Sequence, residues 1–134
     1  MSGAVAPFDE RGLPTGYSYH PEWEWTPREV AARLRSPQAT DRPMVLDCRT
    51  EKERAIVAIV GSRFVPLHEL EARIDEIREW IEESGQPTVI VHCHHGVRSL
   101  RATAVLRAAG VDAHSLAGGI DLWARDVDPT LPRY

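Results

Sequence analysis

Residues 89–99, VIVHCHHGVRS, contain the pattern on which the fold prediction depends. The β-branched apolar run at residues 89–91 predicts a buried strand, and a helical pattern follows the turn that contains Gly96. This arrangement places Cys93 beside a helix N-terminus, where free amide N–H groups and partial positive charge favour an anion. Because the thiolate is the nucleophilic form of cysteine, Cys93 is the candidate catalytic residue. Arg98 adds a fixed positive charge where a small anion would bind.

Strand and helix patterns alternate along the chain on both sides of this segment. Apolar runs predict short strands, while apolar residues at helical spacing, with capping residues and terminal glycines, predict helices. The alternation predicts an α/β fold with a parallel sheet flanked by helices on both faces. Because ligands bind such sheets at the carboxyl ends of the strands, Asp47, Cys93 and Gly118-Gly119 are expected at one edge. The predicted strands are 44–46, 63–65, 88–91 and 111–116, and the predicted helices are 26–34, 50–56, 69–83, 99–109 and 120–125.

Length and composition indicate one globular domain without a general affinity for nucleic acid or membranes. The chain has 134 residues, 43% of them apolar, and its net charge of −4 provides no basic field for nucleic acid or an anionic membrane. No apolar run approaches the roughly 20 residues that span a bilayer, and residues 1–10 lack the pattern of a signal peptide. Two cysteines do not make a disulfide framework. We therefore expect a cytoplasmic protein with an irregular arm at residues 1–24, packed through aromatic side chains, and one domain at residues 25–134.

Four segments of the chain resemble motifs of the single-domain rhodaneses, which are sulfurtransferases that carry sulfur as a cysteine persulfide. Residues 93–99, CHHGVRS, resemble the active-site loop of this family. The other three resemble an early strand ending in Asp-x-Arg, a Gly…Pro-Leu segment and a late Gly-Gly…Trp motif, at 45–49, 61–67 and 116–123. The resemblance covers residues 25–134 and implies a rhodanese-like domain that needs no metal or organic cofactor. One segment departs from the family, because VAIVGS at residues 57–62 replaces Gly-His-Ile-Pro-Gly-Ala.

The resemblance implies a role for each residue of the cysteine loop. Cys93 would attack the outer sulfur of a small donor, such as thiosulfate or a persulfide, and pass it to a thiol, to cyanide or to an acceptor protein. Successive backbone amides from His94 to Arg98 would hold the persulfide, and Arg98 would bind the anionic part of the donor. The residues expected to form this loop and bind the anion are His94, His95, Gly96, Val97, Arg98 and Ser99.

Residues at neighbouring strand ends are expected to support the loop. Asp47 and Arg49 could form a surface ion pair of little energetic value. In the interpretation that we prefer, Asp47 would accept hydrogen bonds from the cysteine loop. Arg49 would pair with Glu53 or Glu51. The resemblance places Gly118-Gly119 in a turn beside the cysteine, where it would shape the entrance for the acceptor.

The spacing within the loop favours sulfur transfer over phosphate chemistry. Four residues separate Cys93 from Arg98, whereas the related cysteine phosphatases have five, and the shorter loop encloses a smaller space that suits one added sulfur atom. A cysteine phosphatase or an arsenate reductase is therefore the less favoured enzyme. Two further interpretations stay open: a sulfur relay that hands the persulfide to a protein, as in cofactor or tRNA thiolation, and a regulatory protein-binding module.

Two other groups of residues have structural interpretations that we prefer. Cys48 lies at a strand end where packing explains it, and a resolving thiol beside a reactive cysteine is the functional alternative. A cluster of His92, His94 and His95 suggests a metal, but adjacent residues seldom point at one ion, and no second pair of ligands stands at zinc spacing. We therefore expect no metal site, with His92 packed in its strand and the other two histidines lining the loop.

Overall fold

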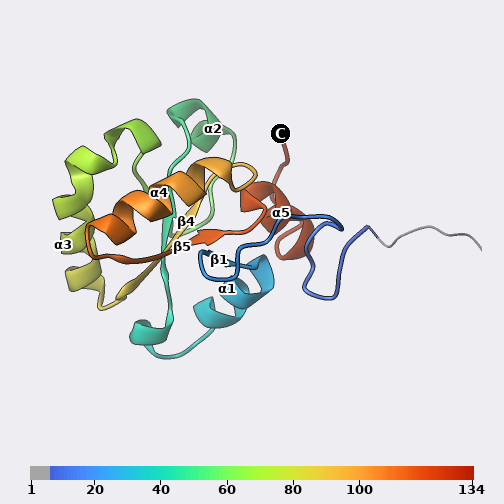
Figure 1. The fold of residues 1–134 in the computed structure, drawn as a ribbon, viewed down its shortest axis with the longest axis horizontal. Helices are drawn as coiled ribbons and strands as arrows, with labels where there is room; N and C mark the ends of the chain where they lie inside the picture. Colours follow the sequence, from blue (N-terminus) through green and yellow to red (C-terminus); the bar gives the residue numbers. More distant parts are fainter. Residues whose placement is uncertain (1–6) are drawn as a thin grey trace, which may run out of the picture.

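Five parallel strands form one sheet, which carries the cysteine loop at its carboxyl edge (Figure 1). The computed structural model describes residues 7–134. Residues 1–6 belong to the predicted arm and to the segment without a signal-peptide pattern, and they lie outside the described residues. The strands are β1 (Glu24–Trp25), β2 (Met44–Asp47), β3 (Arg63–Phe64), β4 (Thr88–His92) and β5 (Asp112–Leu116). Their order is β1–β5–β4–β2–β3, so β4 lies in the middle of the sheet and delivers the cysteine there. The parallel sheet confirms the predicted α/β class.

Helices cover both faces of this sheet. They are α1 (Pro27–Leu34), α2 (Glu51–Ile56), α3 (Ile74–Ser84), α4 (Val97–Ala108) and α5 (Gly119–Asp126), with short 3-10 helices at Ala39–Asp41, Leu67–Glu69 and Glu71–Arg73. Side chains alternate across each strand. Leu46 of β2 therefore packs in a core with α3 and α4, whereas its neighbour Val45 packs in a second core with α1 and α5. The two cores hold the strand ends, and with them the cysteine loop, between two helical layers.

The short elements differ from the sequence predictions more than the long ones do. β1 pairs in parallel with β5, although no strand is predicted there, because two residues are too few to show an alternating pattern. The predicted helix at residues 69–83 begins with 3-10 turns, and its α-helical part starts at Ile74. Both differences leave the predicted architecture unchanged.

The start of α2 places a glutamate near the carboxyl edge of the sheet. Thr50 caps this helix in a capping box, in which its side chain accepts from the Glu53 N–H and the Glu53 side chain accepts from the Thr50 N–H. Because α2 follows β2 after a short connection, the capping box holds Glu53 on the side of the sheet where β4 ends.

Residues of the N-terminal arm pack against the domain. Leu13 is fully buried and shares a small core with Ala117 and Leu122, against which three aromatic side chains of the arm also pack. This contact joins the arm to the start of α5, next to the cysteine loop. Across residues 7–134, no helix combines the length and the apolar character needed to cross a membrane.

Candidate active site

Cys93 follows β4 directly and receives two polar contacts at its sulfur. The backbone N–H of Gly96 donates to the Sγ atom at 3.0 Å, and the Ser99 hydroxyl lies 3.4 Å from the same atom. The hydroxyl of Ser115 in β5 lies 2.7 Å from Ser99 Oγ and orients it. The cysteine is 1% exposed, so these groups act on a sulfur that is shielded from bulk water. Such donors stabilise negative charge on sulfur.

The predicted ring of loop amides is present in part. We expect amides from His94 to Arg98 to converge on Cys93, but in the portion of the chain that the structure describes, Gly96 is the loop residue whose amide hydrogen-bonds the sulfur. The reason is that α4 begins at Val97, and the amides of its first turn point along the helix axis rather than toward one atom. Gly96 has a φ of 110°, a value that glycine adopts readily, and its own N–H reaches the sulfur.

The turn at Gly118-Gly119 fixes the backbone of the cysteine loop. The N–H groups of Ile120 and Asp121, in the first turn of α5, donate to the carbonyls of Cys93 and of the residue after it, at 2.9 and 3.1 Å. A Cβ atom on Gly119 would overlap the same two carbonyl oxygens. The close approach of α5 therefore requires glycine, and the structure brings the predicted glycine pair against the nucleophile.

Tyr17 of the N-terminal arm holds this turn from the other side. Its Oη accepts from the Gly118 N–H at 2.9 Å and donates to the buried carboxylate of Glu24 at 2.7 Å. A Cβ on Gly96 would lie 3.1 Å from the same Oη. The arm thus contacts both glycine turns of the site through one of the aromatic side chains by which it is expected to pack. The sequence does not indicate these two contacts, because the arm has no periodic pattern.

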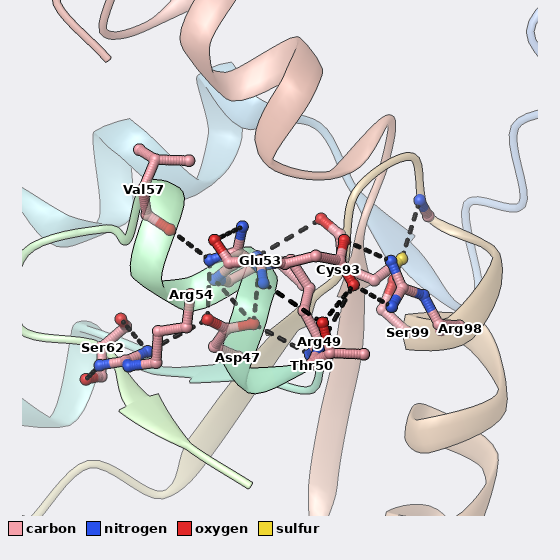
Figure 2. Close-up of polar contacts among 12 residues, drawn as sticks. Asp47, Arg49, Thr50, Glu53, Arg54, Val57, Ser62, Cys93, Arg98 and Ser99 are labelled. Atoms are coloured by element: carbon pink, nitrogen blue, oxygen red, sulfur yellow. Dashed lines mark hydrogen bonds and ion pairs between the residues drawn. The ribbon is translucent and has the colours of Figure 1, made fainter. Parts of the chain in front are cut away.

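Arg98 forms a bidentate ion pair with Glu53 of α2 (Figure 2). The Nη1 and Nη2 atoms donate to the two carboxylate oxygens at 2.5 and 2.8 Å. These hydrogen bonds hold the pKa of Glu53 well below its usual range. The pair forms because α2 and α4 both begin at the carboxyl edge of the sheet. A donor anion, the ligand expected for Arg98, would therefore compete with Glu53 for the guanidinium.

Asp47 and Arg49 form a fully buried ion pair next to this contact (Figure 2). The Nε and Nη2 atoms of Arg49 each donate to a carboxylate oxygen of Asp47 at 2.9 Å, and Arg54 adds a third contact at 3.1 Å. Burial alone would raise the pKa of Asp47, but the hydrogen bonds of Arg49 and the charges around it lower the pKa overall. Two predictions are therefore wrong. Asp47 binds arginines rather than the cysteine loop. Arg49 forms the alternative ion pair, with Asp47, buried rather than on the surface, because residues two apart at a strand end point to the same side. It contacts Glu53 at the backbone carbonyl, at 3.4 Å, rather than at the carboxylate.

The same two arginines hold the segment that departs from the family pattern. The Arg49 Nη2 atom donates to the Val57 carbonyl at 2.6 Å, and the Arg54 Nη2 atom donates to the Ser62 carbonyl at 3.0 Å. Both ends of residues 57–62 are thus hydrogen-bonded to side chains of the β2–α2 region. The segment keeps a fixed conformation without the histidine and proline that it lacks.

Tyr134 completes the site from the C-terminal tail. Its Oη donates to the Glu53 carboxylate at 2.6 Å and accepts from Arg49 at 3.0 Å. Its ring stacks on His94, with 3.9 Å between the centroids, and burial raises the pKa of Tyr134 to about 12. The sequence gives no signal for this contact, because the tail is irregular and its position depends on the whole fold.

The three histidines around Cys93 lie in different environments. His92 is fully buried in β4, which confirms that it is a packed strand residue, and burial lowers its pKa to about 4. His94 and His95 are part of the loop, and their ring centroids lie 3.9 Å apart. Within residues 7–134, the Nε2 atoms of His92 and His94 are buried and have no hydrogen-bond partner. His92 is therefore a neutral core residue near neutral pH.

His94, His95 and Asp121 are residues that could hold a metal ion. Each offers one ligand atom, and these atoms all lie within 4.8 Å of one another. The sequence did not indicate this group, because Asp121 reaches the histidines through the contact between α5 and the loop. Asp121 is already paired with Arg133 through hydrogen bonds at 2.9 and 3.3 Å. An ion would have to displace that arginine.

A cavity of about 690 Å³ lies beside the loop. Cys48, Arg98 and Arg101 line it, together with apolar side chains from residues 66–70 and from α4. Cys48 is 1% exposed, and burial, reinforced by the charges of Cys93 and Asp47, raises the pKa of its thiol. Cys48 is thus a protonated thiol in the wall of a cavity that has room for a small molecule.

Comparison with known proteins identifies the family. Residues 26–126 match the rhodanese-like domain family, and this chain belongs to it. The family predicted from the four motifs is confirmed. Among curated relatives, the adenylyltransferase and sulfurtransferase MOCS3 of Arabidopsis thaliana is 33% identical over an alignment of 108 positions, which covers 72% of this chain and 23% of the relative. The chain thus spans about a quarter of the length of this relative.

Solved structures share the fold. The human single-domain sulfurtransferase TSTD1 superposes with a TM-score of 0.62 and 24% identity, covering 77% of this chain and 96% of that one. The As-Sb reductase of Leishmania major gives a TM-score of 0.67 and 22% identity, covering 81% and 83% of the two chains. At these identities the two likenesses establish the fold, and the chemistry has to be argued from the site.

Proposed function

We propose that this chain is a sulfurtransferase that carries sulfur as a persulfide on Cys93. The thiolate of Cys93 attacks the outer sulfur of thiosulfate, the S–S bond of the donor breaks, and sulfite leaves with the bonding electron pair. A thiol or cyanide then attacks the outer sulfur of the persulfide, and the Cys93 thiolate is regenerated. The observation that carries the proposal is the pair of contacts at the sulfur, from the Gly96 N–H and the Ser99 hydroxyl.

The same contacts favour sulfur transfer over a phosphatase or an arsenate reductase. A phosphoryl group presents several oxygens and requires several converging amides. Gly96 is the loop residue that offers an amide to the sulfur in the described part of the chain, and Glu53 already occupies both donors of Arg98 that face it. One amide and one hydroxyl are sufficient for a single charged sulfur.

A protein thiol is the second acceptor that we consider. The Arabidopsis relative is named as both an adenylyltransferase and a sulfurtransferase, so a domain like this one occurs there within a larger protein. A relay of this kind would use the same Cys93 persulfide and differ in its acceptor. Slow turnover with cyanide together with fast transfer to a protein thiol would favour the relay.

Substitution of the nucleophile tests the proposal. We expect the wild-type chain, treated with thiosulfate, to gain the mass of one sulfur atom on the peptide that contains Cys93. Cys93→Ser should gain none and should lose thiocyanate formation by at least about a hundredfold, because covalent transfer needs the thiolate. Thermal unfolding of both proteins controls for loss of the fold. Sulfur found on Cys48 alone, equal rates in the two proteins, or turnover of an aryl phosphate would contradict the proposal.

A further inference from the structure

We propose that Cys48 resolves the Cys93 persulfide by forming a Cys48–Cys93 disulfide and releasing the outer sulfur as hydrosulfide. This activity rests on the proposed function, which supplies the persulfide. It would unload the protein when no acceptor is present, and it gives a role to a buried thiol that the transfer reaction does not use.

The strand register places the two cysteines side by side. β2 and β4 pair in parallel, and the last pair in their register is Asp47 with His92. The Cys48 N–H donates to the His92 carbonyl at 3.1 Å, which continues the ladder to the next pair of residues, Cys48 and Cys93. Neighbouring strands lie about 4.8 Å apart, a spacing within the range of Cα separations found across disulfides.

The two side chains also point to the same face of the sheet. Leu46 and Val91, two residues before the cysteines, pack in the same core as both of them. Since side chains alternate along a strand, Cys48 and Cys93 share the face of that earlier pair. The negative charge of Cys93 is one of the causes, after burial, that raise the pKa of Cys48, so the two groups interact through space. Both cysteines are free thiols in this structure, and the disulfide is the reacted form.

The reaction needs no oxidant other than the persulfide. The Cys48 sulfur attacks Sγ of Cys93, and the bond between Sγ and the outer sulfur breaks. The outer sulfur leaves with the electron pair and takes the proton of the Cys48 thiol, so a thiol and a persulfide anion become a disulfide and a hydrosulfide ion. The outer sulfur is reduced and the Cys48 sulfur is oxidised, while Sγ of Cys93 exchanges one S–S bond for another. The attacking form is the Cys48 thiolate, so the outer sulfur of the persulfide takes the proton before the new S–S bond forms. Because burial raises the pKa of Cys48, this proton transfer slows the reaction.

The cavity beside the loop gives the resolved state a way back. Cys48 lines this space together with Arg98 and Arg101, whereas Cys93 is not among its lining residues. A small thiol that enters the cavity can attack the Cys48 sulfur of the disulfide. A second thiol of the same kind then releases Cys48, and both cysteines return to the reduced state.

A loading and chase experiment tests the inference. The chain is loaded with thiosulfate, freed of the donor, and incubated without an acceptor. Intact mass is measured without reductant, and free sulfide is measured in parallel. We expect the wild type to lose its added sulfur, to end two hydrogen masses below the reduced protein, and to release one equivalent of sulfide. Cys48→Ser should load equally, keep its persulfide and release at least about tenfold less sulfide, since the resolving thiol is absent.

Each alternative outcome has one meaning. If both proteins load and keep the sulfur equally, the inference is overturned and the proposed function stands. If the wild type does not load, the proposed function fails, and this inference fails with it. Peptide mapping of the wild type requires no variant and provides an independent test, because a disulfide between two chains, or to a small thiol, in place of a Cys48–Cys93 linkage would also overturn the inference.

Discussion

Glu53 controls how much of the Arg98 charge reaches a donor. The carboxylate binds both terminal nitrogens of the guanidinium, so a dianion such as thiosulfate meets a neutralised pair. Glu53→Gln removes the competing charge and keeps the side chain that caps α2. We expect the KM for thiosulfate to fall about threefold, because a partly exposed ion pair is worth about 0.6 kcal/mol, while kcat changes little. Steady-state kinetics with thiosulfate and with an uncharged persulfide donor would measure the difference.

Glu51→Gln is the matched control at this scale. Glu51 is exposed and lies in the same first turn of α2, so its substitution makes the same change of net charge. We expect the KM for thiosulfate to stay within error in this variant. An equal fall in both variants would assign the effect to net charge, and a rise in Glu53→Gln would mean that Glu53 orients Arg98 for the donor.

Residues that are close in the sequence could be predicted to act together, as could groups at the carboxyl ends of neighbouring strands, but contacts that depend on how helices and the tail pack could not. Cys93, Gly96 and Ser99 lie within one turn and the start of a helix, so their contacts at the sulfur follow from local geometry. The partner of Arg98 depends on how α2 faces α4, and the stacking of Tyr134 on the loop depends on the path of the tail. Patterns along the chain indicate neither the orientation of α2 relative to α4 nor the path of the tail.

At the scale of elements, the contact between α5 and the cysteine loop depends on the absence of one side chain. We expect Gly119→Ala to cost at least about 2 kcal/mol more in the free energy of unfolding than Gly85→Ala, because its Cβ would force two carbonyls apart. Gly85 ends α3 with a φ of 69°, close to the 63° of Gly119, and has open space around it. It therefore reports the backbone strain alone, which costs about 1 kcal/mol. Urea unfolding and kcat would be measured for both variants.

The two readouts distinguish a local from a general effect. Displacing the carbonyls of the loop should lower kcat in Gly119→Ala, while Gly85→Ala should keep the wild-type kcat. Equal losses of stability and activity in the two variants would mean that α5 does not fix the loop. The Gly-Gly motif could be located from the sequence because it is a local turn. The close approach that requires glycine at position 119 depends on how α5 packs against the loop, and no local pattern indicates that packing.

At the scale of the whole molecule, the arm and the domain share one core. The sequence divides them at residue 24, because the arm lacks a periodic pattern, yet Leu13 is fully buried against Ala117 and Leu122. Leu13→Ala should therefore lower the global free energy of unfolding by about 3 kcal/mol, in one cooperative transition followed by tryptophan fluorescence. Val60→Ala removes apolar atoms from a side chain that is 96% exposed and should change stability by less than about 0.5 kcal/mol. If Leu13→Ala matched that control, or if a separate early transition appeared, the arm would be a dispensable attachment, and Tyr17 could not hold the Gly118 turn from it.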